Sequence, residues 1–136
     1  MGLSKLLRGT ALLFALGCVS LAPHARAAED GAVVEAKAYS FPSYERAVEA
    51  TDVERYADKA AYESAVGDPK FELLKLRYMS DGLKVVAYVY KPRRVEGRKL
   101  PVIIFNRGSG ARGDIAPELV TFFHRLASEG FVILAP

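Results

Sequence analysis

An unbroken apolar run, Val102 to Phe105, stands between Pro101 and a segment that reads NRGSGARGD. A run of this length bounded by Pro and Gly predicts a strand that is buried on both faces. The segment after it cannot continue the strand, because its three glycines supply the backbone freedom of a loop. A second apolar run, Phe131 to Leu134, follows Gly130. With the helix expected between them, these runs predict one strand–loop–helix–strand unit.

The helix of this unit has a full apolar stripe, which suits packing on a sheet. Asp114 is expected to cap its first turn, with Pro117 inside that turn, and Gly130 is expected to end it. The stripe recurs at i, i+3, i+4, i+7 and i+8, at Leu119, Phe122, Phe123, Leu126 and Ala127.

Two alternating segments precede the unit. Phe71 to Met79 and Leu83 to Tyr90 alternate with the period of half-exposed strands, and the turn Ser80-Asp81-Gly82 joins them. They predict an antiparallel hairpin. The connection after them, KPRRVEGRK from Lys91 to Lys99, is strongly basic and suggests an anionic partner. No aromatic residue interleaves its cations, which favours an ordinary solvated loop.

The segment before the hairpin is acidic, with ten acids and four bases from Glu29 to Asp68. Residues 28–42 are expected to be an extended lead-in. Residues 43–66 have helical spacing, with a predicted capping box at Thr51-Asp52-Val53-Glu54, and Gly67 with Pro69 as a stop signal. We interpret the acidic side chains as the solvated face of a peripheral helix.

The first 27 residues have the form of a cleaved export signal. Lys5 and Arg8 are followed by the largely apolar stretch from Gly9 to Leu21, and Ala25-Arg26-Ala27 has the small-x-small pattern of a cleavage site. The protein is therefore expected to be exported, to a periplasm or to the medium. Two alternatives stay open: lipidation at Cys18 and an uncleaved anchor.

Removal of the leader changes the charge balance. Three of the 19 basic residues lie in it, and the remainder balances the 16 acidic residues. The basic pI gives no reason to expect nucleic-acid binding. The single cysteine also lies in the leader, so no thiol remains for a disulfide, a metal or a nucleophile.

The expected organisation has three parts: a signal peptide (1–27), a lead-in with a peripheral helical segment (28–69), and an α/β unit (70–136). The apolar run that ends the sequence is expected to be an interior strand of a parallel sheet, which needs helices on both faces. One core-facing helix follows the hairpin. The sequence therefore predicts a truncated α/β domain.

The order of these elements resembles the opening of an α/β-hydrolase domain, in the prolyl oligopeptidase and dienelactone hydrolase branch. YMSDGLKVVAYVYKP is similar to the paired N-terminal strands of that branch, KLPVIIFNRGSG to its third strand and HGG-type loop, and EGFVILAP to its fourth strand. Asn106-Arg107 stands where many members have a His before the glycines. The resemblance covers about residues 70–136. It implies an α/β-hydrolase fold of which only the N-terminal strands are present.

The resemblance implies a serine nucleophile in G-x-S-x-G, then an acid and a histidine. This sequence has no G-x-S-x-G: Ser109 lies in RGSGA and Ser128 in LASEG. After the leader the one histidine is His124, which we expect to be a surface histidine of the helix. No catalytic residue is therefore expected in this chain, and one His without Cys predicts no metal site.

One part of such a site has a counterpart here. The loop after the third strand supplies a backbone N–H to the oxyanion hole in this fold. The candidates are the backbone amides of Gly108, Ser109 and Gly110, and Arg107 and Arg112 are candidate contacts to an anionic substrate or partners of acids such as Asp114. A tight turn without a ligand is the other interpretation of the loop.

Two hypotheses follow. The first is the N-terminal part of a secreted serine hydrolase, a peptidase or esterase, which is inactive by itself. Its substrate would be a small ester or peptide, with no cofactor, no nucleic acid and no membrane contact after the leader is removed. The second is a non-catalytic secreted module or a degraded remnant.

Overall fold

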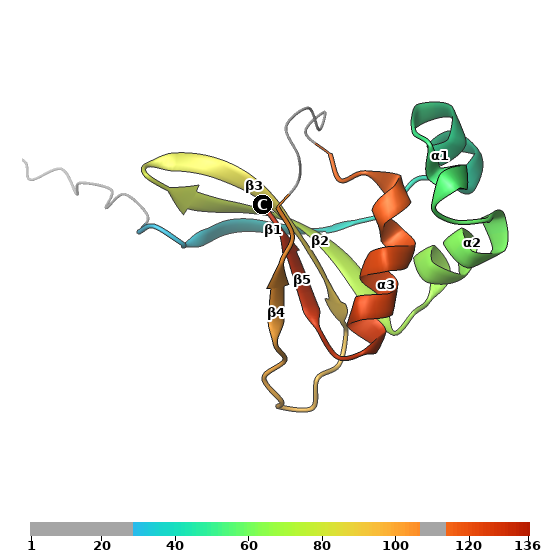
Figure 1. The fold of residues 1–136 in the computed structure, drawn as a ribbon. Coiled ribbons are helices and arrows are strands. Elements are labelled where there is room, and N and C mark those ends of the chain that lie inside the picture. Colours follow the sequence, from blue (N-terminus) through green and yellow to red (C-terminus); the bar gives the residue numbers. More distant parts are fainter. Residues whose placement is uncertain (1–28, 107–113) are drawn as a thin grey trace, which may run out of the picture.

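The computed structural model describes residues 29–106 and 114–136. This part of the chain forms a five-stranded mixed sheet with the order β1-β2-β3-β5-β4, and its three α-helices lie on one side of the sheet (Figure 1). The elements are β1 (Val33–Tyr39), α1 (Tyr44–Ala50), the 3₁₀ turn η1 (Val53–Arg55), α2 (Lys59–Gly67), β2 (Phe71–Ser80), β3 (Leu83–Pro92), β4 (Val102–Ile104), the 3₁₀ turn η2 (Pro117–Leu119), α3 (Val120–Ser128) and β5 (Val132–Ala135).

The predicted hairpin is confirmed. β2 and β3 pair antiparallel along their whole length, from Ser80 opposite Leu83 to Phe71 opposite Pro92. Asp81 and Gly82 both have positive φ angles, 49° and 75°. Two left-handed residues in a two-residue turn match the right-handed twist of the strands, so this turn fixes the register.

β5 is an interior strand, as predicted, but the sheet is mixed and not parallel as predicted, and β4 is an edge strand. β5 pairs antiparallel with β3, with Tyr88 opposite Ala135, and parallel with β4. The prediction that β4 is buried on both faces is wrong, since Val102 and Ile104 are 57% and 63% exposed. The reason is topological: β5 inserts between β3 and β4, so β4 has one neighbouring strand in the described part of the chain.

One core joins the helices to the sheet. α3 packs on β3 and β5, and α2 packs on α3. Burying side chains of this size contributes about 1.5–3 kcal/mol each. The largest fully buried side chains are Val53, Tyr62, Tyr88, Val120, Phe123 and Ile133. The first two come from the acidic helical segment.

The opposite face of the sheet is also apolar. Leu74 lies opposite Val89, which lies opposite Leu134, so these half-buried side chains share one face. The exposed Ile104 continues this row because it is paired with Leu134. The helices lie on the other side (Figure 1).

The extended lead-in contains a strand that the pattern did not predict. β1 pairs antiparallel with β2, with Ala36 opposite Leu76. Val33 and Val34 are both exposed. An edge strand with little burial on either face shows no period of two, which is why its sequence lacks the signal of a strand.

The predicted capping box at Thr51 is wrong. Thr51 follows α1, and its Oγ1 donates a hydrogen bond to the Ala47 carbonyl at 3.0 Å. The caps are Ser43, which accepts from the Arg46 N–H, and Asp58, which accepts from the Ala61 N–H at 2.8 Å. The helical segment is therefore divided into α1, η1 and α2. Its predicted end at Gly67 is confirmed.

Asp114 does not cap the third helix. The helix begins as η2 at Pro117, continues as α3, and neither part has a side-chain cap. Its predicted end is confirmed, because Gly130 takes a φ of 93° and its N–H bonds to the Ala127 carbonyl. The stripe is also largely as expected, although Phe122 is exposed.

Candidate functional site

The candidate site lies where β4 and β5 end. The Phe105 N–H donates to the Leu134 carbonyl at 2.7 Å, and the chain leaves the sheet at Asn106. In open α/β sheets, ligands bind outside the carboxyl ends of the strands. The oxyanion candidates follow directly in the sequence. They lie outside the described residues, as do the candidate substrate contacts: Gly108, Ser109, Gly110, Arg107 and Arg112.

Asp114, the first described residue after that segment, is tied to two strands. Its Oδ1 accepts hydrogen bonds from the Tyr88 hydroxyl and the Lys75 ammonium, both at 2.7 Å. The ammonium also lies 5.4 and 5.5 Å from the ring centroids of Tyr88 and Tyr39, which is within cation–π range. Since Tyr88 faces Ala135, this cluster lies at the carboxyl ends of β4 and β5.

The protonation states of this cluster favour an anchor over a catalytic role. The hydrogen bond to Asp114 raises the pKa of Lys75, so its amine stays charged and has no lone pair to act as a base. Burial raises the pKa of the Tyr88 hydroxyl, which stays protonated at neutral pH. The hydrogen bonds from Lys75 and Tyr88 hold Asp114 against β2 and β3.

Sequence reasoning missed this cluster, although one signal of it is present. Lys75 occupies a core-facing position of β2, two residues after the buried Leu73. A cation on the buried face of a strand needs a partner, because an unpaired charge there is costly. The identity of that partner, 39 residues away, comes only from the tertiary structure.

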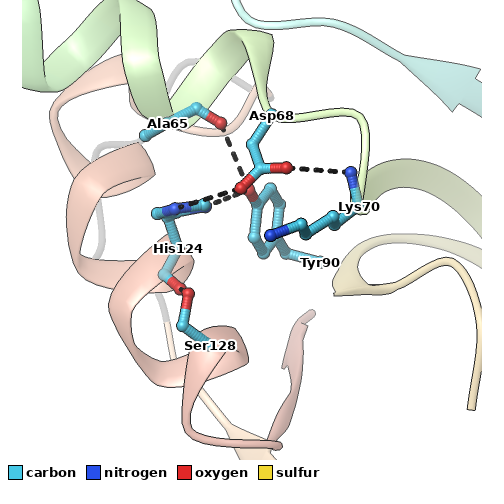
Figure 2. Close-up of polar contacts among 6 residues, drawn as sticks. All are labelled: Ala65, Asp68, Lys70, Tyr90, His124 and Ser128. Carbon is cyan, nitrogen blue, oxygen red and sulfur yellow. Dashed lines mark hydrogen bonds and ion pairs between the residues drawn. The ribbon is translucent and has the colours of Figure 1, made fainter.

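His124 is not a surface histidine, so that prediction is wrong. Its side chain is 22% exposed, and its ring lies edge-on to Phe71 with centroids 4.7 Å apart. Its Nδ1 lies 3.1 Å from the Tyr90 hydroxyl (Figure 2). The imidazole therefore joins α3 to the start of β2 and the end of β3, where β4 and β5 begin.

The surroundings of His124 contain the residue types of a nucleophilic triad, but not its connections. Asp68 Oδ2 lies 3.8 Å from Nε2 (Figure 2). The Ser128 hydroxyl donates to the backbone carbonyl of His124 itself at 2.8 Å, so it is not poised on the ring. Burial raises the pKa of Tyr90 to about 12, and its hydroxyl also lies 3.4 Å from the Ala65 carbonyl. This cluster joins α2, α3 and β3 and offers no activated nucleophile.

Across residues 29–106 and 114–136, no three His, Cys, Asp or Glu side chains gather as they do around a metal ion. Within these ranges, no helix has the length and apolar character needed to cross a membrane.

These features define a mixed α/β protein with a candidate site at the carboxyl ends of two parallel strands. No protein-family model, no curated protein and no solved structure matches the chain. The assignment of a function consequently depends on the residues of this chain.

Proposed function

We propose that this chain is the N-terminal part of an exported serine hydrolase with an α/β-hydrolase fold, of the prolyl oligopeptidase and dienelactone hydrolase branch. Its contribution to catalysis is the oxyanion side of the site. Backbone amides of Gly108, Ser109 or Gly110 would donate to the oxyanion that develops on an ester or amide carbonyl. Arg107 and Arg112 would contact an anionic part of the substrate.

One observation carries the proposal. The glycine-rich segment leaves the carboxyl end of β4, and the chain returns through α3 as β5, parallel and adjacent to β4. The hairpin of β2 and β3 joins this unit antiparallel through β5. Ligands of open α/β sheets bind at this end of the strands, which is where an oxyanion loop must lie to act.

The nucleophile, acid and base of a triad are not supplied by this sequence. It has no G-x-S-x-G, and its one histidine after the leader is held by Tyr90 and Phe71. Activity therefore requires residues outside this sequence, which is inactive by itself.

The test has a genetic and a chemical arm. We expect the coding region beyond Pro136 to continue in frame and to encode G-x-S-x-G within roughly the next hundred residues. The complete product should then react with a fluorophosphonate probe, and intact mass should show one adduct on the serine of that motif. A stop codon directly after Pro136, or a complete product without an adduct, would refute the proposal.

A second candidate is a non-catalytic secreted module. The observation that favours it is the shared core, in which side chains from all three helices and from the sheet are fully buried. Expression of residues 28–136 discriminates between the two. A soluble monomer with one cooperative unfolding transition supports the module, whereas aggregation supports a part of a larger domain.

A further inference from the structure

A concave surface lies at the other end of β4 and β5, where these strands begin. A cavity of about 620 Å³ opens there between the start of β2, the connection from β3 to β4, and the end of α3. Small-molecule sites have volumes of roughly 300–1,000 Å³. The cavity is therefore large enough to hold a small organic ligand.

The lining of this cavity has one sign of charge. Within the described part of the chain, it contains four basic side chains and no acidic one: Lys70, Arg93, Arg94 and Arg98. Glu72 pairs with Arg93 at 3.4 Å and with Lys91 at 2.5 Å. Across the described ranges, the charged groups of Lys70, Arg94 and Arg98 form no ion pair. These side chains are exposed, so their charges remain available to an anion that enters the cavity.

A tight turn brings two of the arginines to the same cavity. The Arg98 N–H donates to the Val95 carbonyl at 2.8 Å, and the residues between them, Glu96 and Gly97, have φ angles of 45° and 75°. Arg94 and Arg98 flank this turn and line the cavity, while Glu96 does not. Glycine at the second position takes its positive φ without strain.

The remaining walls suit an apolar chain. Apart from Ser128 and Gly130, they are formed by apolar residues: Pro69, Phe71, Pro92, Val95, Leu100 and Ala127. The end of α3 borders the cavity, and two of its last carbonyls already accept hydrogen bonds, Ala127 from the Gly130 N–H and Leu126 from the Phe131 N–H. The helix terminus consequently presents fewer free carbonyls that would repel an anion.

We propose that this cavity binds a small amphipathic anion, with its carboxylate or phosphate head on Arg94 and Arg98 and a short apolar chain over the Phe71 and Leu100 side. Guanidinium groups suit both heads because their N–H groups form bidentate, charge-assisted hydrogen bonds. The head group that binds more tightly distinguishes a carboxylate ligand from a phosphate ligand. The proposal does not depend on the hydrolase function.

Calorimetric titration of the full chain tests the proposal, with octanoate and octyl phosphate as the probes. Acetate and inorganic phosphate, which lack the octyl tail, measure how much the tail contributes to binding. Octylammonium, which carries the opposite charge, measures how much the negative charge contributes. We expect at least one octyl anion to bind about tenfold more tightly than its tailless counterpart and than octylammonium. The preferred head identifies a carboxylate or a phosphate ligand.

The variant pair Arg94→Gln and Arg98→Gln should weaken octyl-anion binding about tenfold or more, since each loses charge-assisted hydrogen bonds. Arg46→Gln with Arg55→Gln, which makes the same change of net charge away from the cavity, should leave binding unchanged. If the cavity variant does not fold, as judged by circular dichroism, Lys70→Gln replaces it with about a threefold loss expected.

Three outcomes of the titrations would overturn the proposal. They are binding of octylammonium equal to that of both octyl anions, unchanged affinity in the cavity variant, and equal binding of tailed and tailless anions for both head groups. Binding to phosphatidylglycerol vesicles without binding to either octyl anion would also overturn it, because a membrane surface would then be the partner.

Discussion

At the scale of single residues, Tyr90 is where the sheet meets both α2 and α3. Its ring stacks on Phe71 with centroids 5.9 Å apart, and its hydroxyl lies against His124 and the Ala65 carbonyl (Figure 2). A buried hydroxyl and a mostly buried imidazole each need a partner, since an unsatisfied polar group costs about 1–3 kcal/mol. The two side chains should therefore depend on each other.

We expect Tyr90→Phe to lower the free energy of unfolding by about 1 kcal/mol and His124→Ala by about 2 kcal/mol, since the second change also removes the ring contact with Phe71. The double variant should lose less than the sum, with a coupling energy of about 0.5–1 kcal/mol. Urea denaturation measures all three. Arg125→Ala, on the exposed side of α3, is the control and should change little. Strict additivity would contradict the contact.

Two buried tyrosines predict a loss of stability in alkali. Burial raises the pKa of Tyr62 and of Tyr90 from 10 to about 12. In the unfolded chain these hydroxyls ionise near pH 10, whereas the folded chain keeps them protonated. Their contribution is therefore complete below pH 10 and is lost between pH 10 and 12, at up to about 1.4 kcal/mol per pH unit for each tyrosine.

The urea midpoint at pH 8, 10 and 11 measures this loss. Tyr62→Phe and Tyr90→Phe should each flatten the decline. Tyr56→Phe, at a side chain that is 65% exposed, should leave the slope as it is. An identical slope in all four proteins would mean that other groups cause the alkaline transition.

At the scale of elements, β4 and β5 have similar sequences and opposite environments. Val102-Ile103-Ile104 lies at the edge of the sheet, and Val132 to Ala135 lies inside it. The edge leaves backbone groups and apolar side chains exposed, which is the usual template for pairing with another chain. The two strands should respond differently to the same kind of substitution.

Ile133→Ala should cost about 2–5 kcal/mol, because Ile133 is fully buried and its loss leaves a cavity. Ile104→Lys should change stability by less than about 0.5 kcal/mol and should reduce self-association. Denaturation and sedimentation velocity measure the two effects. Leu83→Lys, at the exposed tip of the hairpin, is the matched control and should leave self-association unchanged. Equal reduction by both lysines would show that β4 pairing is not the cause.

Substitution of alanine for two glycines with open surroundings should change the stability of the protein in opposite directions. A Cβ at Gly82 or at Gly67 meets no atom within 4 Å, so only the backbone differs. Gly82 has a φ of 75°, and Gly82→Ala should cost about 1 kcal/mol. Gly67 ends α2 without a positive φ, and Gly67→Ala should stabilise by up to about 1 kcal/mol. Thermal denaturation of both variants checks the signs, and equal signs would contradict the turn geometry.

At the scale of the whole molecule, the core on one face of the sheet contrasts with the apolar row on the other. The helices bury Tyr88 and Ile133, while Leu134 and Ile104 on the opposite side are half-buried or exposed. A sheet face in water is usually polar, and only β4 and β5 of this sheet are parallel. The apolar character of the uncovered row therefore supports the proposal that the chain works as part of a larger domain.

The 136-residue chain is expected to hydrolyse p-nitrophenyl acetate no faster than a boiled sample, because no serine, histidine and acid of its described residues form a triad. Spectrophotometric release of p-nitrophenolate measures the rate. Ser109→Ala should behave like the unchanged chain. Activity that disappears with this substitution would contradict the assignment of Ser109 to a backbone role.

The local elements of the C-terminal half were predictable because their signals are local. The alternation from Phe71 to Tyr90, the Asp81-Gly82 turn and Gly130 after the helix each act through neighbouring residues, and the structure confirms them. The predictions that Thr51 and Asp114 cap helices were wrong, because each side chain has more than one possible hydrogen-bond partner. Thr51 bonds back to Ala47, and Asp114 bonds to side chains distant in sequence.

The sequence by itself determined the hairpin, the helix stripe and the lack of a G-x-S-x-G motif, since these follow from periodicity, turn chemistry and residue identity. Only the tertiary structure decided that β5 lies between β3 and β4, that Asp114 meets Lys75 and Tyr88, and that His124 is held against Tyr90. The last two depend on contacts across 26 to 39 residues, and the strand order depends on pairings such as Tyr88 with Ala135, which are 47 residues apart. A contact of that kind depends on how the chain folds as a whole, because no local pattern specifies which distant group arrives.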